Sequence, residues 1–265
     1  RRSRGRVRGG AWRGCGRCDR CARLGAAGAS GRARTGRWPC GRRCAPAYVE
    51  RMWPRRSDAE TSRQSMVDRQ IAARGVEDPA VLAAMREVPR ERFVPDEEAA
   101  WAHEDRPLPI GEGQTISQPL VVARMCELLA LTGEETVLDV GTGSGYHAAV
   151  LAKLAARVVS IERYPELSEA AARSLDRTGI ENVSLVVGDG SLGWPAEAPY
   201  EAINVAAAAR HGMPPALIEQ LADRGRMVIP VDGEDQRLVL VTREGEEIQV
   251  EAVERVRFVP LVEDA

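Results

Sequence analysis

The chain has 265 residues, of which 44% are hydrophobic and 29% are charged, the composition of an ordinary globular protein. No stretch approaches 18 apolar residues, which excludes a transmembrane helix. The formal net charge of -2 conceals two unlike parts, because residues 1–60 hold 17 arginines and four acids, whereas residues 61–265 carry a net charge of -15. The composition therefore places a boundary near residue 60.

Residues 1–60 are rich in arginine and glycine and contain five of the six cysteines. They show no helical or strand periodicity and few large aliphatic side chains, so we expect a disordered extension. The apolar core of a signal peptide is absent, and ten glycines argue against the amphipathic helix of a transit peptide. The abrupt change of composition, with Met66 close to the start of a helical pattern, favours the interpretation that residues 1–65 lie upstream of the natural start.

Two other interpretations of this segment stay open. Cys15, Cys18 and Cys21 follow a C-x-x-C-x-x-C pattern, with Cys40 and Cys44 downstream, and clustered thiolates can bind zinc or an iron–sulfur cluster. The spacing fits no zinc pattern well and no histidine lies nearby, so we expect no metal site. Richness in arginine and glycine also suits nonspecific binding of nucleic acid through phosphate contacts.

From residue 61 the sequence alternates between helix and strand patterns. We expect a helix that opens at Ser65 and ends at Gly75, and a second helix over 80–87 with Asp78 as its N-cap. Further helices are expected over 118–131, 147–155, 165–177 and 214–222, and strands over 136–140, 157–162, 183–187, 202–205, 227–231, 238–242 and 247–261. The helix over 118–131 would bury Val121, Met125, Leu128 and Leu129. Repeated strand–helix–strand units predict an α/β fold, a doubly wound and mostly parallel sheet with antiparallel C-terminal strands.

The strand over 136–140 runs directly into a glycine loop, residues 141–145 (GTGSG). Glycines let the backbone approach a ligand closely, and this loop lies at the sheet edge where doubly wound folds bind ligands. The pattern differs from the dinucleotide fingerprint, because Tyr146 occupies the place of the third glycine. A nicotinamide-dependent oxidoreductase is therefore a distant alternative.

Three acidic residues lie at the ends of successive strands around this loop. Asp139 precedes the loop by two residues, and Glu162 ends the next strand, where a carboxylate can accept hydrogen bonds from both hydroxyls of a ribose. Asp189 ends the third strand and is placed to accept from an adenine amino group. Each acid alone could be a solvated carboxylate. Together they predict an adenosine site without phosphates, as S-adenosylmethionine requires.

A run of Gly, Thr, Ser and Pro, residues 113–119 (GQTISQP), precedes the helix over 118–131. We expect this run to be a loop in which Ser117 caps the helix. Thr115, Ser117 and the neighbouring backbone N–H groups also make an anion site at the helix N-terminus. A substrate carboxylate could bind there.

At these residues the chain resembles the protein-L-isoaspartate (D-aspartate) O-methyltransferase family. The resemblance covers about residues 65–262 and rests on six segments: 66–95, EDRPLPIGEGQTISQP, VLDVGTGSGYHAAVLA, VVGDGSLGW, AAAARHGMPPALIEQL and RVRFVPL. It implies a Rossmann-like class I fold and methyl transfer from S-adenosylmethionine to the α-carboxylate of L-isoaspartyl residues, and more weakly of D-aspartyl residues. The ester then cyclises without enzyme to a succinimide.

The resemblance also assigns the site residues. Ser117 is the implied catalytic residue, and Thr115, Ile116 and Ser117 would bind the substrate. The implied cofactor residues are Gln114, Asp139, Gly141, Thr142, Gly143, Gly145, Glu162, Asp189 and Gly190. No metal is implied. A carboxylate is already ionised at pH 7, so methyl transfer to it needs no general base, and Ser117 would orient the carboxylate.

Several residues depart from the family pattern or have no role in it. Arg210–Gly212 replaces a usual proline and could border the substrate, residues 222–225 replace Lys-Pro-Gly-Gly, and Asn204 interrupts an apolar strand. We expect His147 on a helix surface and Cys126 in the core.

Three functions stay under consideration. Repair of isoaspartyl proteins by a cytoplasmic monomer is favoured, without a membrane partner. Methylation of a dedicated aspartate in a partner peptide is the second. The third is an arginine-rich protein that binds nucleic acid or metal through residues 1–60, with the methyltransferase domain secondary.

Overall fold

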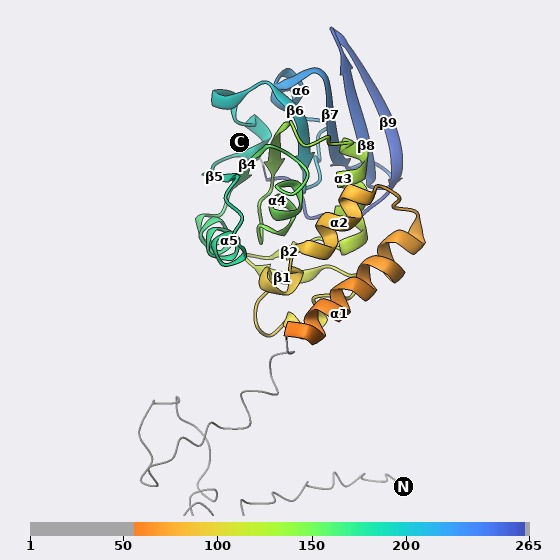
Figure 1. Ribbon diagram of the computed structural model, residues 1–265. Helices are drawn as coiled ribbons and strands as arrows, with labels where there is room; N and C mark the ends of the chain where they lie inside the picture. Colours follow the sequence, from red (N-terminus) through yellow and green to blue (C-terminus); the bar gives the residue numbers. More distant parts are fainter. Residues whose placement is uncertain (1–55, 263–265) are drawn as a thin grey trace, which may run out of the picture. The chain divides into compact units, whose positions relative to one another are not determined.

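The computed structural model describes residues 56–262, and the expectations for residues 1–55 lie outside this range. Seven strands form one sheet in the order β5-β4-β3-β6-β7-β8-β9 (Figure 1). The strands are β3 (Thr136–Val140), β4 (Arg157–Glu162), β5 (Val183–Val187), β6 (Tyr200–Val205), β7 (Leu221–Val231), β8 (Arg237–Glu244) and β9 (Glu247–Arg255). The first five of these are parallel, and β8 and β9 are antiparallel. The predicted doubly wound, mixed sheet is confirmed.

Helices cover both faces of the sheet. Successive residues of a strand point to opposite faces and are therefore buried by different helices. Val137 and Val158 pack with the helices α2 (Pro79–Glu87), α3 (Pro119–Leu129) and α4 (Tyr146–Leu151), whereas Leu138 and Val159 pack with α6 (Pro215–Glu219). Helix α5 (Pro165–Thr178) lies beside β4 and β5 (Figure 1). Burial on both faces explains why these strands read as continuous apolar runs.

The N-terminal helix differs from the expectation. Helix α1 (Arg56–Met66) begins nine residues before Ser65, so the boundary expected at residue 60 falls inside it. It continues through a π-helical turn η2 (Val67–Ile71) and a 3₁₀ turn η3 (Ala72–Arg74), and it ends at Gly75 with a φ of 93°. Arg63 of α1 pairs with Glu91 at 3.1 Å in a buried position. The ion pair between Arg63 and Glu91 thus stabilises a part of α1 that the hydrophobic pattern does not predict.

Three other elements end three or more residues before the predicted position. Helix α4 stops at Leu151, short of residue 155, where Asn182 Nδ2 donates to the carbonyl oxygens of Ala152 and Ala155. Helix α6 ends at Glu219 and not at residue 222, because the chain enters β7 at Leu221, six residues before the start expected for this strand at Met227. Strand β9 ends at Arg255, and the segment beyond it turns back, so that Leu261 N donates to Ala208 O.

The segment before α3 is a β-hairpin and not the expected loop. Strand β1 (Leu108–Gly111) pairs with β2 (Gln114–Ile116) across a turn in which Glu112 and Gly113 have φ values of 48° and 69°. Two positive φ values are typical of the two-residue turns that join hairpin strands. Short η turns connect the remaining elements: η4 (Arg90–Arg92), η5 (Ala99–Trp101), η6 (Gly190–Leu192) and η7 (Pro195–Glu197).

Within residues 56–262, no helix is both long and apolar enough to cross a membrane.

Candidate active site

A narrow cavity lies at the carboxyl edge of the parallel strands, where the glycine loop follows β3. Its walls come from hairpin residues Gln114 and Thr115, from the strand ends and the loops that follow them, and from the C-terminal segment Val259–Val262. The strand-end group comprises Val140, Gly141, Gly143, Ile161, Glu162, Arg163, Tyr164, Gly190, Ala206 and Ala207. The fold therefore brings five predicted cofactor residues, Gln114, Gly141, Gly143, Glu162 and Gly190, to one cavity.

The glycine loop needs its glycines for conformation and for packing. Gly141, Gly143 and Gly145 have φ values of 92°, 52° and 84°, a region that side chains with a Cβ rarely adopt. A Cβ on Gly145 would lie 3.0 Å from Ala171 Cβ of α5. Gly145 therefore allows helix contact, whereas Gly141 and Gly143 line the cavity.

Glu162 holds the glycine loop against the end of β4. Its side chain is buried, Oε2 accepts from Gly143 N at 2.8 Å, and Oε1 accepts from Tyr164 N at 2.9 Å. Each carboxylate oxygen has a second lone pair. The carboxylate therefore fixes the loop and keeps acceptor capacity at the cavity wall.

Gly190, just after the end of β5, is packed too closely against Val140 to carry a side chain. A Cβ there would lie 2.5 Å from Val140 Cγ1. The adjacent Asp189 accepts through Oδ1 from Ser191 N at 2.9 Å and from Ser191 Oγ at 2.7 Å. The carboxylate of Asp189 thus begins the turn η6, and Gly190 is the member of this pair on the cavity wall.

Asp139, which lies beneath the loop, and the loop residue Thr142 do not line this cavity. Asp139 is fully buried, and its Oδ2 accepts from Ser160 Oγ at 2.7 Å. Ser160 Oγ also shares a hydrogen bond of 2.6 Å with Thr142 Oγ1. Oδ1 accepts from Asn204 Nδ2 at 2.7 Å. Burial raises the pKa of Asp139 to about 6, although the bonds from Ser160 and Asn204 oppose the rise. The network supports the loop from below.

The expectation that His147 lies on a helix surface is wrong. The ring is buried, its Nδ1 is 3.2 Å from Asn204 Nδ2 and its Nε2 is 3.6 Å from Cys126 Sγ. Burial lowers the pKa of His147 to about 3, so the ring is neutral. Nδ1 accepts from Asn204, which leaves Nε2 to carry the proton. Cys126 is buried in the core as expected.

A signal for this network exists in the sequence. Asn204 of β6 pairs in register with Asp139 of β3, so two polar residues of otherwise apolar strands lie side by side. Buried polar side chains need partners. Asn204 uses its amide protons on Asp139 and His147, and its Oδ1 has no hydrogen-bond partner among the described residues.

A second cavity of about 650 Å³ adjoins the first. It is lined by Pro107, Thr115, Ser117, Gln118, Val121, Ala206 and the segment Arg255–Val259. A small third cavity holds Thr115, Ile116 and Ser117 together with the glycine loop, His147 and Ala206. Thr115 and Ala206 line all three cavities. Ser117 therefore lies where a ligand beside the hairpin meets a ligand beside the glycine loop.

The prediction that Ser117 caps α3 is wrong. The N-cap residue is Gln118, and it forms no side-chain cap. Asp105, in the preceding loop, caps the helix instead. Its Oδ1 accepts from Leu120 N at 3.1 Å, and its Oδ2 accepts from Gln118 Nε2 at 2.7 Å. Arg74 pairs with the same carboxylate. Ser117 Oγ makes no hydrogen bond to the part of the chain that the structure describes.

The buried face of α3 is also shifted from the prediction. Met125 and Leu129 are buried as expected, but Val122 and Cys126 take the places expected for Val121 and Leu128, which are half-buried. Val121 instead lines the second cavity.

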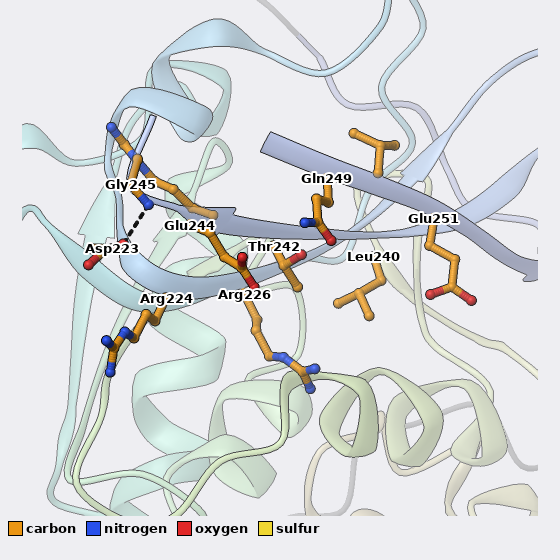
Figure 2. Close-up of a pocket in the computed structure, with 11 residues that line it drawn as sticks. Asp223, Arg224, Arg226, Leu240, Thr242, Glu244, Gly245, Gln249 and Glu251 are labelled. Atoms are coloured by element: carbon orange, nitrogen blue, oxygen red, sulfur yellow. Dashed lines mark hydrogen bonds between the residues drawn. The ribbon is translucent and has the colours of Figure 1, made fainter. Parts of the chain in front are cut away.

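Two further regions lie away from these cavities. Arg210 and His211 are exposed, and Arg210–Gly212 lines none of the three. A groove of about 920 Å³ on β7–β9 contains none of the predicted site residues (Figure 2). Figure 2 shows Arg226 pointing toward α3, where its Nη1 donates to Leu128 O at 3.0 Å, and the bond from Gly245 N to Asp223.

Within the described residues, no group of three or more His, Cys, Asp or Glu side chains is arranged to hold a metal ion. The cysteines of the C-x-x-C pattern lie outside these residues.

Comparisons with known proteins agree on one family. The model of the protein-L-isoaspartate(D-aspartate) O-methyltransferase family matches residues 61–265. Protein-L-isoaspartate O-methyltransferase 1 of Rhodopseudomonas palustris (strain HaA2) is 54% identical over 78% of this chain and 87% of its own length. The protein-L-isoaspartate O-methyltransferase of Protochlamydia amoebophila (strain UWE25) is also 54% identical, over 74% of this chain and 95% of its own length.

Solved structures give the same result. One protein-L-isoaspartate O-methyltransferase structure has a TM-score of 0.67 at 30% identity, covering 75% of this chain and 65% of that one. A second structure, described as a protein-L-isoaspartate O-methyltransferase from Plasmodium falciparum in complex with S-adenosyl-L-homocysteine, has a TM-score of 0.66 at 25% identity. It covers 76% of this chain and 99% of the other.

Proposed function

Because the chain belongs to the protein-L-isoaspartate(D-aspartate) O-methyltransferase family, we propose that it methylates the α-carboxylate of L-isoaspartyl residues in damaged proteins. D-aspartyl residues are weaker substrates. The observation that carries the proposal is that Ser117 lines a substrate-sized cavity which shares Thr115 and Ala206 with the cavity of the glycine loop and Glu162.

The residues around the glycine loop fit S-adenosylmethionine. Gly141, Gly143 and Gly190 line the cavity with backbone, because positive φ values at the first two and the close approach of Val140 to the third disfavour side chains there, and Glu162 adds a buried carboxylate to the wall. Glu162 would accept from the ribose hydroxyls and Asp189 from the adenine amino group. When bound, S-adenosylmethionine supplies a methyl group on a positively charged sulfur, which is open to attack by a carboxylate oxygen.

The chain's own residues act by positioning and not by proton transfer. The acceptor carboxylate is ionised at pH 7, so the reaction needs no base. His147 is buried, neutral and bonded on both ring nitrogens. The hydroxyl of Ser117 would donate to one oxygen of the acceptor carboxylate and hold the other toward the methyl group. Proximity and alignment of this kind can supply a large part of the rate enhancement.

The methyl ester that results cyclises without enzyme to a succinimide, and hydrolysis returns part of the material to normal aspartate. The proposal places this repair in the cytoplasm and assigns it to a monomer. Methylation of a dedicated aspartate in a partner peptide is the second candidate, and a panel of unrelated isoaspartyl peptides separates the two, because only a repair enzyme methylates most of them.

Two variants test the separate roles of the two cavities. Ser117→Ala should lower kcat/KM for an isoaspartyl peptide by about tenfold to a hundredfold. A hydrogen bond to a charged group contributes about 1.5–3 kcal/mol, and its loss gives a change of this size. The same variant should leave the Kd for S-adenosylhomocysteine unchanged. Glu162→Gln should weaken that Kd by a similar factor. Ser184→Ala, on β5, is the control, because Ser184 lines none of the three cavities. If Ser117→Ala kept full activity, the assignment of the acceptor site would be wrong.

A further inference from the structure

The cavity that contains Ser117 has a charge opposite to that of the domain around it. Residues 61–265 carry a net charge of -15, yet the charged side chains that line the cavity are Arg255 and Arg257, without any acid. The remaining wall is formed by Pro107, Val121, Phe258 and other apolar or uncharged residues. Such a wall favours a peptide that carries negative charge.

The two arginines differ in what they contact. Arg255 Nη2 pairs with Asp235 Oδ2 at 2.7 Å. Arg257 forms no ion pair or hydrogen bond with any side chain or backbone group in the described part of the chain, and it is exposed. Its guanidinium, with five N–H donors, is therefore available to a ligand in this cavity.

The backbone on both sides of Arg257 is fixed. Val256 N donates to Gln236 O at 3.0 Å, and Phe258 N donates to the Gln236 side chain. One residue further on, Val259 O accepts from Ala208 N at 2.8 Å. Arg257 therefore extends from an anchored stretch of chain and not from a loose tail, which limits the entropy lost when it binds an anion.

We propose that Arg257 forms an anion subsite that binds a carboxylate of the substrate peptide other than the one that is methylated, namely the side chain of an acidic residue near the isoaspartyl residue. This inference rests on the proposed function. It gives the enzyme a preference for damaged sites in acidic stretches of sequence, even though the domain as a whole is acidic and repels such peptides at long range.

The test uses pairs of acetylated and amidated peptides. The two peptides of a pair differ at one position near the isoaspartyl residue, which is Glu in one and Gln in the other. In one pair this position precedes the isoaspartyl residue, and in a second pair it follows it. The full chain should methylate the better placed Glu peptide with a kcat/KM about twofold to fivefold above that of its Gln counterpart, as expected for a partly exposed ion pair. The preference should fall at 0.5 M salt. Arg257→Gln should abolish the preference, because it should lower the kcat/KM of the Glu peptide to the value that the same variant shows for the Gln peptide.

Arg237→Gln is the matched control, because Arg237 is an exposed arginine of β8 that lines none of the three cavities. It removes the same charge from the same full chain and should keep the preference for Glu. Equal rates for the Glu and Gln peptides in the unmodified protein would overturn the subsite alone. So would an equal loss on both peptides in Arg257→Gln, which would place this arginine at the acceptor carboxylate. Failure to methylate any isoaspartyl peptide would overturn the proposed function and the subsite with it.

Discussion

The buried pair of Asp139 and His147 should give the protein two opposing pH dependences that cancel until one partner is replaced. Burial raises the pKa of Asp139 from 3.8 to about 6 and lowers the pKa of His147 from 6.5 to about 3. Between pH 4 and 6 the folded state therefore holds its proton on Asp139. The unfolded state holds one proton on His147. Both states bind one proton, so the pair adds no slope to the stability curve.

Each substitution should expose the contribution of the other residue. The contribution of Asp139 to the free energy of unfolding falls by about 3 kcal/mol as pH rises from 3.8 to 6. The contribution of His147 to the free energy of unfolding rises by about 5 kcal/mol as pH rises from 3 to 6.5. Relative to the unmodified protein, Asp139→Asn should thus become more stable by about 1.4 kcal/mol per pH unit between pH 4 and 6. His147→Gln should become less stable at the same rate.

Urea unfolding followed by tryptophan fluorescence at half-unit steps from pH 4 to 7 measures both slopes. Asparagine keeps an acceptor for Asn204, and glutamine can accept from the same amide, so both variants should fold. Slope changes of the same sign in the two variants, or no change in either, would refute the assignment of one neutral histidine and one proton-binding carboxyl to this network.

Three further substitutions test the site and its supports. Gly190→Ala should weaken binding of S-adenosylhomocysteine and cost about 1–3 kcal/mol of stability, because its Cβ would lie 2.5 Å from Val140 Cγ1. Gly188→Ala, whose Cβ would approach its nearest neighbour to only 3.6 Å, should change neither property in calorimetry and urea unfolding. Arg224→Gly should raise the Tm by about 2–4 °C in a thermal scan, since it relieves a φ of 62° in a side chain with a Cβ; an unchanged Tm would contradict this. Asp105→Ala should destabilise the protein by about 1–2 kcal/mol through loss of the α3 cap, and Asp105→Asn should lose much less.

Part of the fold follows directly from local sequence. The bounds of β3, β4 and β5 agree with the predicted ranges, because each is a short apolar run between polar residues. The cavity around the glycine loop could also be predicted, since successive parallel strands must end at the same edge of the sheet. Glu162 and Gly190 lie there for that reason.

The missed features depend on partners distant in sequence. The hairpin before α3 consists of two very short strands, and its turn contains Glu112 where asparagine or aspartate would be the usual signal. Ser117 is a good capping residue, yet Asp105 binds the helix N-terminus from 15 residues upstream of Leu120. Asn204 of β6 contacts the buried ring of His147, which lies on α4. Local pattern contains neither of these contacts.

The central claim concerns the acceptor, so the most direct measurement is methyl transfer to a matched pair of peptides. The full chain is incubated with radiolabelled S-adenosylmethionine and two peptides of one sequence, one with an L-isoaspartyl residue and one with a normal aspartyl residue. The account predicts a base-labile methyl ester on the isoaspartyl peptide alone. Absence of label from both peptides, while calorimetry still detects cofactor binding, would contradict it and leave a methyltransferase with a different acceptor.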